Sequence, residues 1–286
     1  MTDPIRPNRH DRSGAVAGAD AGATLVKLAI RGAGGDTRLE AVPVAEVEAV
    51  AGRLRAAGAA RVGITGGGAR RLAHLLDSDT VEVAEFDAWS IGARRLLRQA
   101  GAESERFLLV SVGTGTSAML VDGTRVSRVG GTALGGGTVM GLCAQLTGQR
   151  RFRQIAELAA AGDRRKVDLL IADIYPEGDF VLPGEVNAAS FAKIASHAGP
   201  VDAADLAHGV MGLVGENVAL ICCGLAAATK VDRIMWGGAT LRDNPSLVAV
   251  ISGVCRALGR QPLFLPDGEF VGALGALEWA ADRDNT

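Results

Sequence analysis

The sequence RVGGTALGGGT, at residues 128–138, and the earlier SVGTGTS, at residues 111–117, carry most of the information about the fold of this chain. The first segment has five glycines in the nine residues 130–138 and leads into the apolar stretch VMGLCAQL. Glycine at this density is entropically costly to fold, which disfavours a purely structural role. Successive backbone N–H groups in such turns form an anion-binding concavity, and the start of a helix adds further donors. We therefore expect a ligand that carries phosphate, although SVGTGTS alone would also suit a plain hairpin turn.

The sequence around these turns alternates between predicted strands and predicted helices. Apolar runs predict paired antiparallel strands at residues 23–32 and 38–44, and residues 44–58 have the apolar spacing of a helix. A second hairpin begins near Arg106, so each half of the chain starts with a glycine-turned hairpin and continues with helices and strands. This duplicated plan is typical of a two-lobed α/β architecture with a cleft between the lobes. The expected division is a disordered tail at residues 1–14, a first lobe at 15–105 and a second lobe at 106–286.

The composition is that of an ordinary globular protein. The chain has 286 residues, of which 48% are apolar and 22% charged, and its net charge of -2 argues against broad nucleic-acid binding. Its four cysteines lie in apolar helical stretches without metal-type spacing, which indicates reduced thiols and a cytoplasmic protein. The polar N-terminus is not a secretory signal. The apolar run at residues 203–230 is interrupted by Asp205, His208 and Glu216, so we expect a buried helix and no membrane span.

The segment GADAGATLVK, at residues 18–27, is a candidate site for phosphoryl transfer. The Asp20 carboxylate, the Thr24 hydroxyl and the Lys27 ammonium could converge there. Phosphoryl transfer uses these groups, because a carboxylate can hold Mg²⁺ and a cation can stabilise the developing charge. The same segment also suits a tight strand-entry turn with surface charges.

Two further charged residues are candidates on chemical grounds. Glu85, in AEFDAWSIG, could accept the proton of a substrate hydroxyl. A carboxylate in this position is more often simply the charge at a helix N-terminus, where the helix dipole favours negative charge. Arg128 could form a bidentate pair with a substrate carboxylate, or could be a solvated charge at a strand end. The junctions TGGGA at 65–69 and WGGATLR at 236–242 repeat the strand–glycine–helix pattern and could add further walls to the cleft.

In this order, the segments resemble those of the type II (eukaryotic-like) pantothenate kinases, which have a two-lobed actin-like (ribonuclease H-like) ATPase fold. The resemblance covers roughly residues 16–280, and its most specific part is RVGGTALGGGT. Other matching segments are GADAGATLVK, ITGGGARRL, EFDAWSIGARRLL, SVGTGTSAMLV, VDLLIADIYP, NAASFAK, RIMWGGATLR and GEFVGALGALE.

The resemblance implies ATP- and Mg²⁺-dependent phosphorylation of pantothenate, the first step of coenzyme A biosynthesis. It also implies a homodimer formed through the second lobe, with the helix at residues 203–230 as an interface, and coenzyme A or acyl-CoA as a feedback ligand. Glu85 matches the catalytic carboxylate, and Arg128, Thr114 and Thr116 match the pantothenate pocket. The phosphate-binding positions are Asp20 (also the magnesium ligand), Gly22, Thr24, Lys27, Gly113, Gly115, Gly135, Gly136, Gly137 and Thr138.

The chain departs from the family pattern at three positions. Ala23 stands where a glycine is usual, which would weaken ATP binding if that position required a positive φ. Ala192 replaces a glycine, and Thr114 replaces a serine but keeps the hydroxyl. Two other functions remain open: a kinase for a sugar or another small alcohol, and a non-catalytic module that binds nucleotide or coenzyme A. We expect the turns near 113–117 and 135–138 to meet the 20–27 hairpin across a shared crevice.

Overall fold

The computed structural model describes residues 14–32, 34–76, 78–176, 183–196 and 199–282. The chain divides into two compact units, of which the first combines Met1–Arg95 with Phe270–Thr286 and the second is Leu96–Glu269. The sequence-based boundary at residue 105 had assigned the C-terminal residues to the second lobe. They join the first unit because their helix, α9 (Val271–Asp282), packs on the strands of the first sheet. The expected tail, apart from Gly14, lies outside the described residues.

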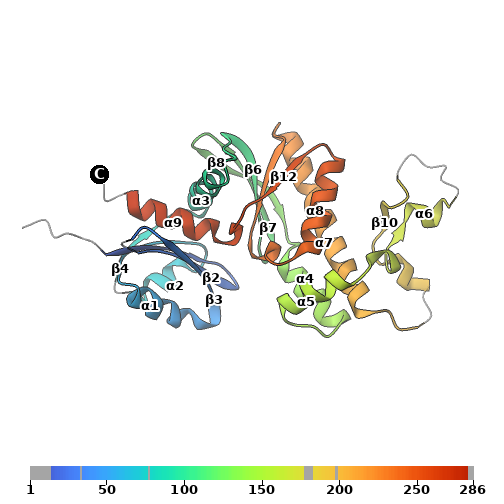
Figure 1. Cartoon of the computed structure of the whole chain (residues 1–286), viewed down its shortest axis with the longest axis horizontal. Coiled ribbons are helices and arrows are strands. Elements are labelled where there is room, and N and C mark those ends of the chain that lie inside the picture. Colours follow the sequence, from blue (N-terminus) through green and yellow to red (C-terminus); the bar gives the residue numbers. More distant parts are fainter. Residues whose placement is uncertain (1–13, 33, 77, 177–182, 197–198, 283–286) are drawn as a thin grey trace, which may run out of the picture. The chain divides into compact units, whose positions relative to one another are not determined.

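The first unit is built on a five-stranded mixed sheet with the order β3-β2-β1-β4-β5. Strands β1, β2 and β3 form consecutive antiparallel hairpins, and β4 and β5 run parallel to β1. Figure 1 shows α1 and α2 on one face of this sheet and α9 on the other. Its elements are β1 (Ala15–Ala21), β2 (Leu25–Arg31), β3 (Thr37–Pro43), α1 (Val47–Ala56), β4 (Ala59–Thr65), α2 (Ala69–Ala73), β5 (Asp79–Glu82), α3 (Glu85–Gln99) and α9.

Glycines allow α9 to lie directly on its neighbours. A Cβ atom at Gly18 of β1 would lie 2.0 Å from a backbone oxygen of α9, and one at Gly63 of β4 would be equally close to the next turn. Helices α3 and α9 also meet backbone to backbone, because a Cβ at Gly275 would lie 1.7 Å from the Ala88 oxygen. Real Cβ atoms essentially never come closer than 3.0 Å to a non-bonded atom. These contacts therefore need glycine, and they hold α9 at a fixed position in the first unit.

The second unit repeats the strand arrangement of the first. Its sheet has the order β12-β11-β6-β7-β8, in which β6, β7 and β8 form antiparallel hairpins and β11 and β12 run parallel to β6. The predicted hairpin of each half is present, as β2–β3 and β6–β7, but β1, which precedes the first of them, was not predicted as a strand. Its elements are β6 (Arg106–Val112), β7 (Thr116–Asp122), β8 (Arg125–Thr132), α4 (Gly136–Leu146), α5 (Phe152–Ala161), β9 (Leu169–Leu170), α6 (Ile171–Ile174), β10 (Asn187–Ala189), α7 (Ala203–Ala228), β11 (Arg233–Gly237), α8 (Pro245–Ala257) and β12 (Gln261–Phe264).

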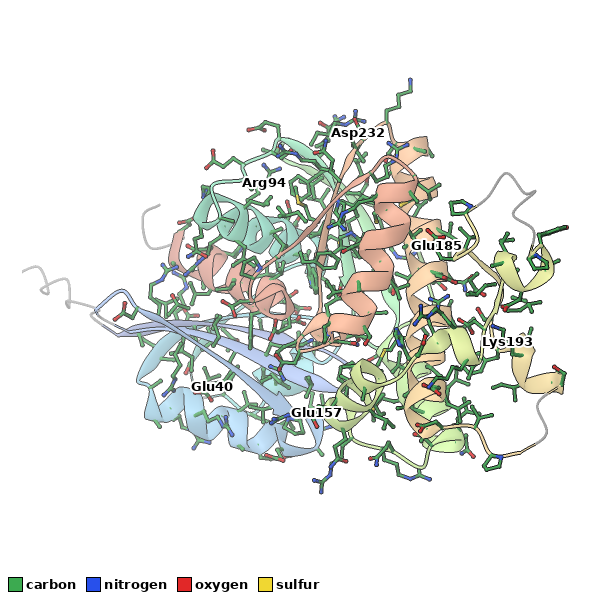
Figure 2. The ribbon with its side chains drawn as sticks, turned by 45° about the vertical axis from the view of Figure 1, so that its right-hand side comes forward. Glu40, Arg94, Glu157, Glu185, Lys193 and Asp232 are labelled. Atoms are coloured by element: carbon green, nitrogen blue, oxygen red, sulfur yellow. The ribbon has the colours of Figure 1, made fainter. Side chains whose placement is uncertain are left out.

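Helix α7 is the central helix of the second unit. Among the described helices, it alone is long and apolar enough to cross a membrane by length and composition, and 56% of its most apolar window is buried in the unit. It packs against α4, α5 and α8, and its buried residues belong to the same apolar core as Trp236 of β11. On the surface of the unit, Glu157 pairs with Arg153 one turn earlier on α5, and Figure 2 shows Glu157 on the outside.

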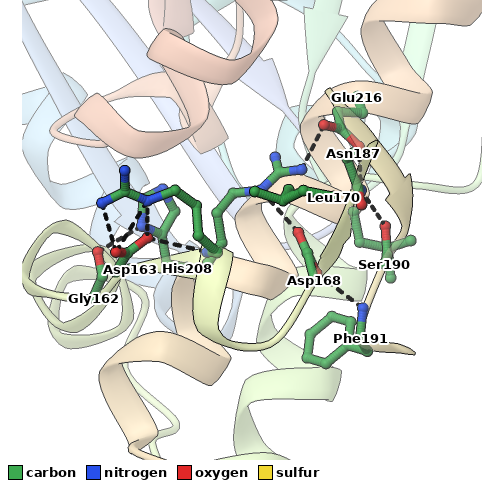
Figure 3. Close-up of polar contacts among 12 residues, drawn as sticks. Gly162, Asp163, Asp168, Leu170, Asn187, Ser190, Phe191, His208 and Glu216 are labelled. Carbon is green, nitrogen blue, oxygen red and sulfur yellow. Dashed lines mark hydrogen bonds and ion pairs between the residues drawn. The ribbon is translucent and has the colours of Figure 1, made fainter. Parts of the chain in front are cut away.

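A partly buried network of charges fastens the β9–α6–β10 segment to α7, and the sequence patterns did not predict it. The Arg164 guanidinium donates to Asp168 at 2.8 Å and to Glu216 of α7 at 2.5 Å (Figure 3). Asn187 of β10 donates to the second oxygen of Glu216 at 2.9 Å. Asp168 is fully buried and also accepts the N–H of Phe191 at 2.9 Å.

Candidate active site

In the first unit, Asp20 and Lys27 form a charged pair at the turn end of the first hairpin. They are direct cross-strand partners on β1 and β2, and the Lys27 Nζ lies 3.7 Å from the Asp20 Oδ2. Only 4% of Asp20 is exposed. Burial raises the pKa of its carboxyl above the ordinary value, and the neighbouring Lys27 ammonium partly opposes that rise. The predicted convergence of Asp20 and Lys27 is therefore present in the structure.

Glu85 is the first residue of α3 and is exposed. Although its surface is exposed, partial desolvation by the surrounding protein and the negative charge of Asp20 raise the pKa of its carboxyl, whereas the Lys27 charge lowers it. The Glu85 carboxylate therefore lies within electrostatic reach of both residues. We call Asp20, Lys27 and Glu85 the acidic cluster. The sequence offered two interpretations of Glu85, a carboxylate at a helix start and a candidate base. The structure is compatible with both, because Glu85 begins α3 and also lies near Asp20 and Lys27.

Two glycines far apart in the sequence make room for the Asp20 carboxylate. A Cβ at Gly66, in the TGGGA junction, would lie 2.8 Å from Oδ1, and a Cβ at Gly272 of α9 would lie 2.7 Å from Oδ2. Gly66 also has a φ of +89°, which favours glycine. Sequence reasoning found the TGGGA junction but missed Gly272. Its only signal was the small-residue sequence GALGA of α9.

The turn between β1 and β2 accommodates the alanine that departs from the family pattern. The N–H of Gly22 donates to the oxygen of Leu25 at 3.1 Å, and a Cβ at Gly22 would lie 3.1 Å from the Lys27 Nζ. Thr24 and Ala23 are exposed. Ala23 has no positive φ, so its methyl group strains no backbone here. The described non-glycine residues with a positive φ are Phe191, Lys230, Asp243 and Asp267.

The acidic cluster is suited to magnesium that arrives with a nucleotide. Among the described residues, no three His, Cys, Asp or Glu side chains gather in the manner of a preformed metal site. Mg²⁺ commonly binds one or two carboxylates together with substrate phosphates and waters. The buried Asp20 carboxylate, with Gly66 and Gly272 leaving space beside its oxygens, fits that mode of binding.

In the second unit, the start of α4 holds the turn between β6 and β7. The Gly136 N–H donates to the Gly113 oxygen at 2.8 Å, and the Gly137 N–H donates to the Thr114 oxygen at 2.9 Å. The Gly113 N–H donates to the Gly115 oxygen at 2.8 Å and closes the turn. We call Gly113–Gly115 the 113–115 turn. Two amides that we expected to face a phosphate are therefore used inside the protein.

These bonds determine which way the amides of the 113–115 turn point. In a planar trans peptide, the carbonyl of one residue and the N–H of the next point in opposite directions. The carbonyls of Gly113 and Thr114 point toward α4, so the N–H groups of Thr114 and Gly115 point away from it. Successive N–H groups with this orientation form an anion-binding concavity.

The remaining glycines and threonines of the two segments serve mainly to pack them together. A Cβ at Gly135 would lie 2.8 Å from the Gly115 Cα. The Thr138 hydroxyl donates to Ala133 at 3.3 Å. The hydroxyl of Thr116, which is 4% exposed, donates to the Leu134 oxygen at 2.8 Å. Thr116 therefore holds the two segments to each other, whereas we had expected it to line the substrate pocket.

Arg128 is exposed on β8, and its guanidinium lies over Gly131. A Cβ at Gly131 would lie 3.0 Å from the Arg128 Nη2, so the glycine leaves space for the guanidinium. Within the described part of the chain, Arg128 makes no ion pair or hydrogen bond with another side chain. Its five N–H donors can therefore pair with the carboxylate of a ligand.

A cavity of about 340 Å³ lies beside the ends of β11 and β12. Gly237 and Gly238, from the predicted WGGATLR junction, line it together with Leu241, Phe264 and Asp267. A Cβ at Gly238 would lie 2.4 Å from the oxygen of Val112, the residue before the 113–115 turn. The cavity and the turn are therefore neighbours within the second unit.

Comparison with known proteins shows which family this chain is related to and which fold it shares with solved structures. The Fumble family model matches residues 98–278. The chain is 34% identical to the type II pantothenate kinase of Bacillus cereus (strain ATCC 10987 / NRS 248) over 93% of this chain and 98% of that one. Among solved structures, it resembles component A of (R)-2-hydroxyglutaryl-CoA dehydratase from Acidaminococcus fermentans, with a TM-score of 0.66, 19% identity and coverage of 96% and 100%. It also resembles a ROK family glucokinase from Streptomyces griseus, with a TM-score of 0.61, 15% identity and coverage of 94% and 100%. These likenesses confirm the two-lobed actin-like ATPase fold.

Proposed function

This chain belongs to the type II pantothenate kinase family, and we propose that its acidic cluster and glycine turns carry out the ATP-dependent phosphorylation of pantothenate. This reaction is the first step of coenzyme A biosynthesis. The observation that carries the assignment of roles is the electrostatic coupling of Glu85 with Asp20 and Lys27. A base, a magnesium ligand and a cation are the side chains that phosphoryl transfer to an alcohol requires.

In this mechanism, Glu85 acts as the general base. Its carboxylate takes the proton of the primary hydroxyl of pantothenate as that oxygen attacks the γ-phosphorus. The bond between the γ-phosphorus and the β–γ bridging oxygen breaks, and ADP leaves. The raised pKa of Glu85 suits the role, because a base is most effective when its pKa approaches the working pH.

The other two residues of the acidic cluster, Lys27 and Asp20, would act on the negative charge of the phosphates, Lys27 directly and Asp20 through a bound magnesium ion. Lys27, held 3.7 Å from Asp20, would stabilise the negative charge that develops on the transferred phosphoryl group. Asp20 would hold the magnesium ion, either directly or through water. When bound, the ion supplies charge neutralisation at the phosphate oxygens.

In the second unit, we assign the phosphates of ATP to the 113–115 turn and the nucleoside to the cavity at Gly237 and Gly238. The adjacency of the cavity to that turn supports this assignment. The carboxylate of pantothenate would pair with Arg128, whose guanidinium is exposed and has no side-chain partner among the described residues. The Thr114 hydroxyl remains our candidate for a second contact with pantothenate.

We further propose that the enzyme is a cytoplasmic homodimer that binds coenzyme A or acyl-CoA as a feedback ligand. Apolar residues on the surface of α7 support the dimer, since Leu220 is 51% exposed and Ile221 is 38% exposed. Leu146, at the end of the adjoining helix α4, is 43% exposed. Size-exclusion chromatography with light scattering of the wild type and of Leu220→Glu tests this interface: a wild-type monomer would exclude it.

The roles in the acidic cluster are tested by Glu85→Gln, with Asp87→Asn as the matched control. Both are exposed carboxylates in the first turn of α3. ADP release by the wild type should depend on pantothenate. Glu85→Gln should reduce kcat by a factor of at least about 100, since general bases typically contribute that much, and should leave ATP binding nearly intact. Asp87→Asn should retain activity. Equal losses in both variants would rule out Glu85 as the base.

The role of Arg128 is tested with Arg125→Met as the control on the same strand. Arg128→Met should raise the KM for pantothenate far more than the KM for its carboxylate-free alcohol analogue. Arg125→Met, which changes another exposed arginine of β8, should alter neither value. Equal effects of Arg128→Met on both acceptors would instead favour an alcohol or sugar without a carboxylate as the natural substrate.

A further inference from the structure

Thr240 donates a hydrogen bond to the 113–115 turn from a distant part of the sequence. It lies in the short 3-10 turn Ala239–Leu241 that follows β11, and it is 4% exposed. Its hydroxyl donates to the Gly113 oxygen at 2.8 Å. The same oxygen accepts the Gly136 N–H, so both lone pairs of this carbonyl are used. A Cβ at Gly136 would lie 2.5 Å from the Thr240 Oγ1, which explains the glycine at that position.

The Thr240 backbone is itself held in place by a hydrogen bond from Asn244. Asn244, which is 1% exposed, donates from Nδ2 to the Thr240 oxygen at 3.1 Å and contacts Met211 Sδ of α7 at 3.5 Å. Its Oδ1 accepts the N–H of Leu247 and caps the start of α8. Asn244 therefore joins the Thr240 turn to α7 and α8, both of which contribute residues to the apolar core of the second unit.

We infer that Thr240 is a positioning residue for phosphate binding, an inference that rests on the proposed role of the 113–115 turn. The Gly113 carbonyl and the Thr114 N–H belong to one planar peptide and point in opposite directions. The Thr240 hydroxyl fixes the carbonyl end of that peptide and thereby the direction of its N–H end. With Gly136 as the only donor to this carbonyl, the peptide could rotate about the remaining bond and the amides would converge less well on a phosphate.

The test compares Thr240→Val, Thr240→Ser and Thr229→Val. Valine keeps the shape of threonine and removes the hydroxyl, whereas serine keeps the hydroxyl. Thr229 is the matched control, because its hydroxyl also donates to a backbone oxygen, that of Leu225 at 2.7 Å, at the end of α7. We expect Thr240→Val to raise the Kd and KM for ATP about tenfold, the equivalent of about 1.4 kcal/mol. Its KM for pantothenate should change less than about twofold, Thr240→Ser should restore most of the ATP affinity, and Thr229→Val should leave both constants at their wild-type values.

The readouts separate this inference from the proposed function. ATP binding by calorimetry requires no turnover, so wild type that binds ATP but does not phosphorylate pantothenate would contradict the proposed function and leave the positioning test valid. Unchanged ATP affinity in Thr240→Val would overturn the inference, as would an equal rise in both KM values. Thermal unfolding checks that each variant is folded. If Thr240→Val does not fold, Thr240→Ala takes its place, and failure of Thr240→Ser to retain ATP affinity would refute the role of the hydroxyl.

Discussion

Replacing Arg164 by methionine should destabilise the second unit severely, because it leaves a buried carboxylate without its cation. Only 14% of the Arg164 side chain is exposed, and none of Asp168 is. Removing one partner of a buried ion pair typically costs about 3–5 kcal/mol. Since Glu216, the second acceptor, is 23% exposed, we expect a loss at the lower end of that range, about 3 kcal/mol at pH 8.

The destabilisation should depend on pH in a defined direction. Burial raises the pKa of Asp168 above its ordinary value of 3.8, and the Arg164 charge opposes that rise. Without Arg164, the pKa of Asp168 in the folded protein rises further, while its value in the unfolded chain stays the same. A group whose pKa is raised by folding opposes folding as the pH increases through that folded pKa. The stability difference between wild type and Arg164→Met should therefore be smaller at pH 5 than at pH 8.

Urea unfolding followed by circular dichroism at 222 nm and by tryptophan fluorescence measures this difference. Arg165→Met is the control, since the adjacent Arg165 pairs with Asp163 at the surface, where 69% of its side chain is exposed. Exposed pairs contribute little, so the control should unfold at nearly the wild-type urea concentration. Adding Asp168→Asn to Arg164→Met should recover part of the loss at pH 8. Similar midpoints for Arg164→Met and Arg165→Met, or a loss that does not vary with pH, would refute the reasoning.

Three other outcomes follow from the structure. Gly275→Ala should lower the midpoint of thermal unfolding, because its Cβ would lie 1.7 Å from a backbone oxygen of α3. The control Gly52→Ala in α1 adds a Cβ that meets no atom within 4 Å, and it should stabilise the protein by about 0.5–1 kcal/mol. A fall in both midpoints would contradict this packing. The kcat/KM for pantothenate should decline on acidification through a pKa above 4.5, because burial and the Asp20 charge raise the pKa of Glu85; a decline only below 4.5 would count against Glu85 as the base. Cys222 should resist a thiol-specific chromogenic reagent at pH 8 in the native enzyme, because burial raises its pKa to about 12, and mass mapping of a rapidly modified Cys222 would show that the helix opens.

Local sequence predicted those parts of the site that lie in continuous segments. Asp20 and Lys27 are seven residues apart on one hairpin, so a strand pattern with a glycine turn was sufficient to bring them together. Contacts between distant segments could not be read in this way. Gly272 lies beside Asp20, and Thr240 donates to Gly113, only because of how the helices and strands pack. The glycine-rich sequence predicted an anion-binding turn, but without the hydrogen bonds it could not show that Gly136 donates to Gly113.

The first unit is assembled from both ends of the polypeptide, and this affects the order in which the protein can mature on the ribosome. Residues 96–269 are contiguous, so all of the second unit emerges before the C-terminal helix of the first. The surface of β1 and β4 that contacts α9 therefore stays exposed until α9 has been synthesised. Asp20 acquires its neighbour Gly272 only when the final segment is translated. A product truncated before α9 would therefore keep all three residues of the acidic cluster but lack the α9 backbone that lies beside the Asp20 carboxylate.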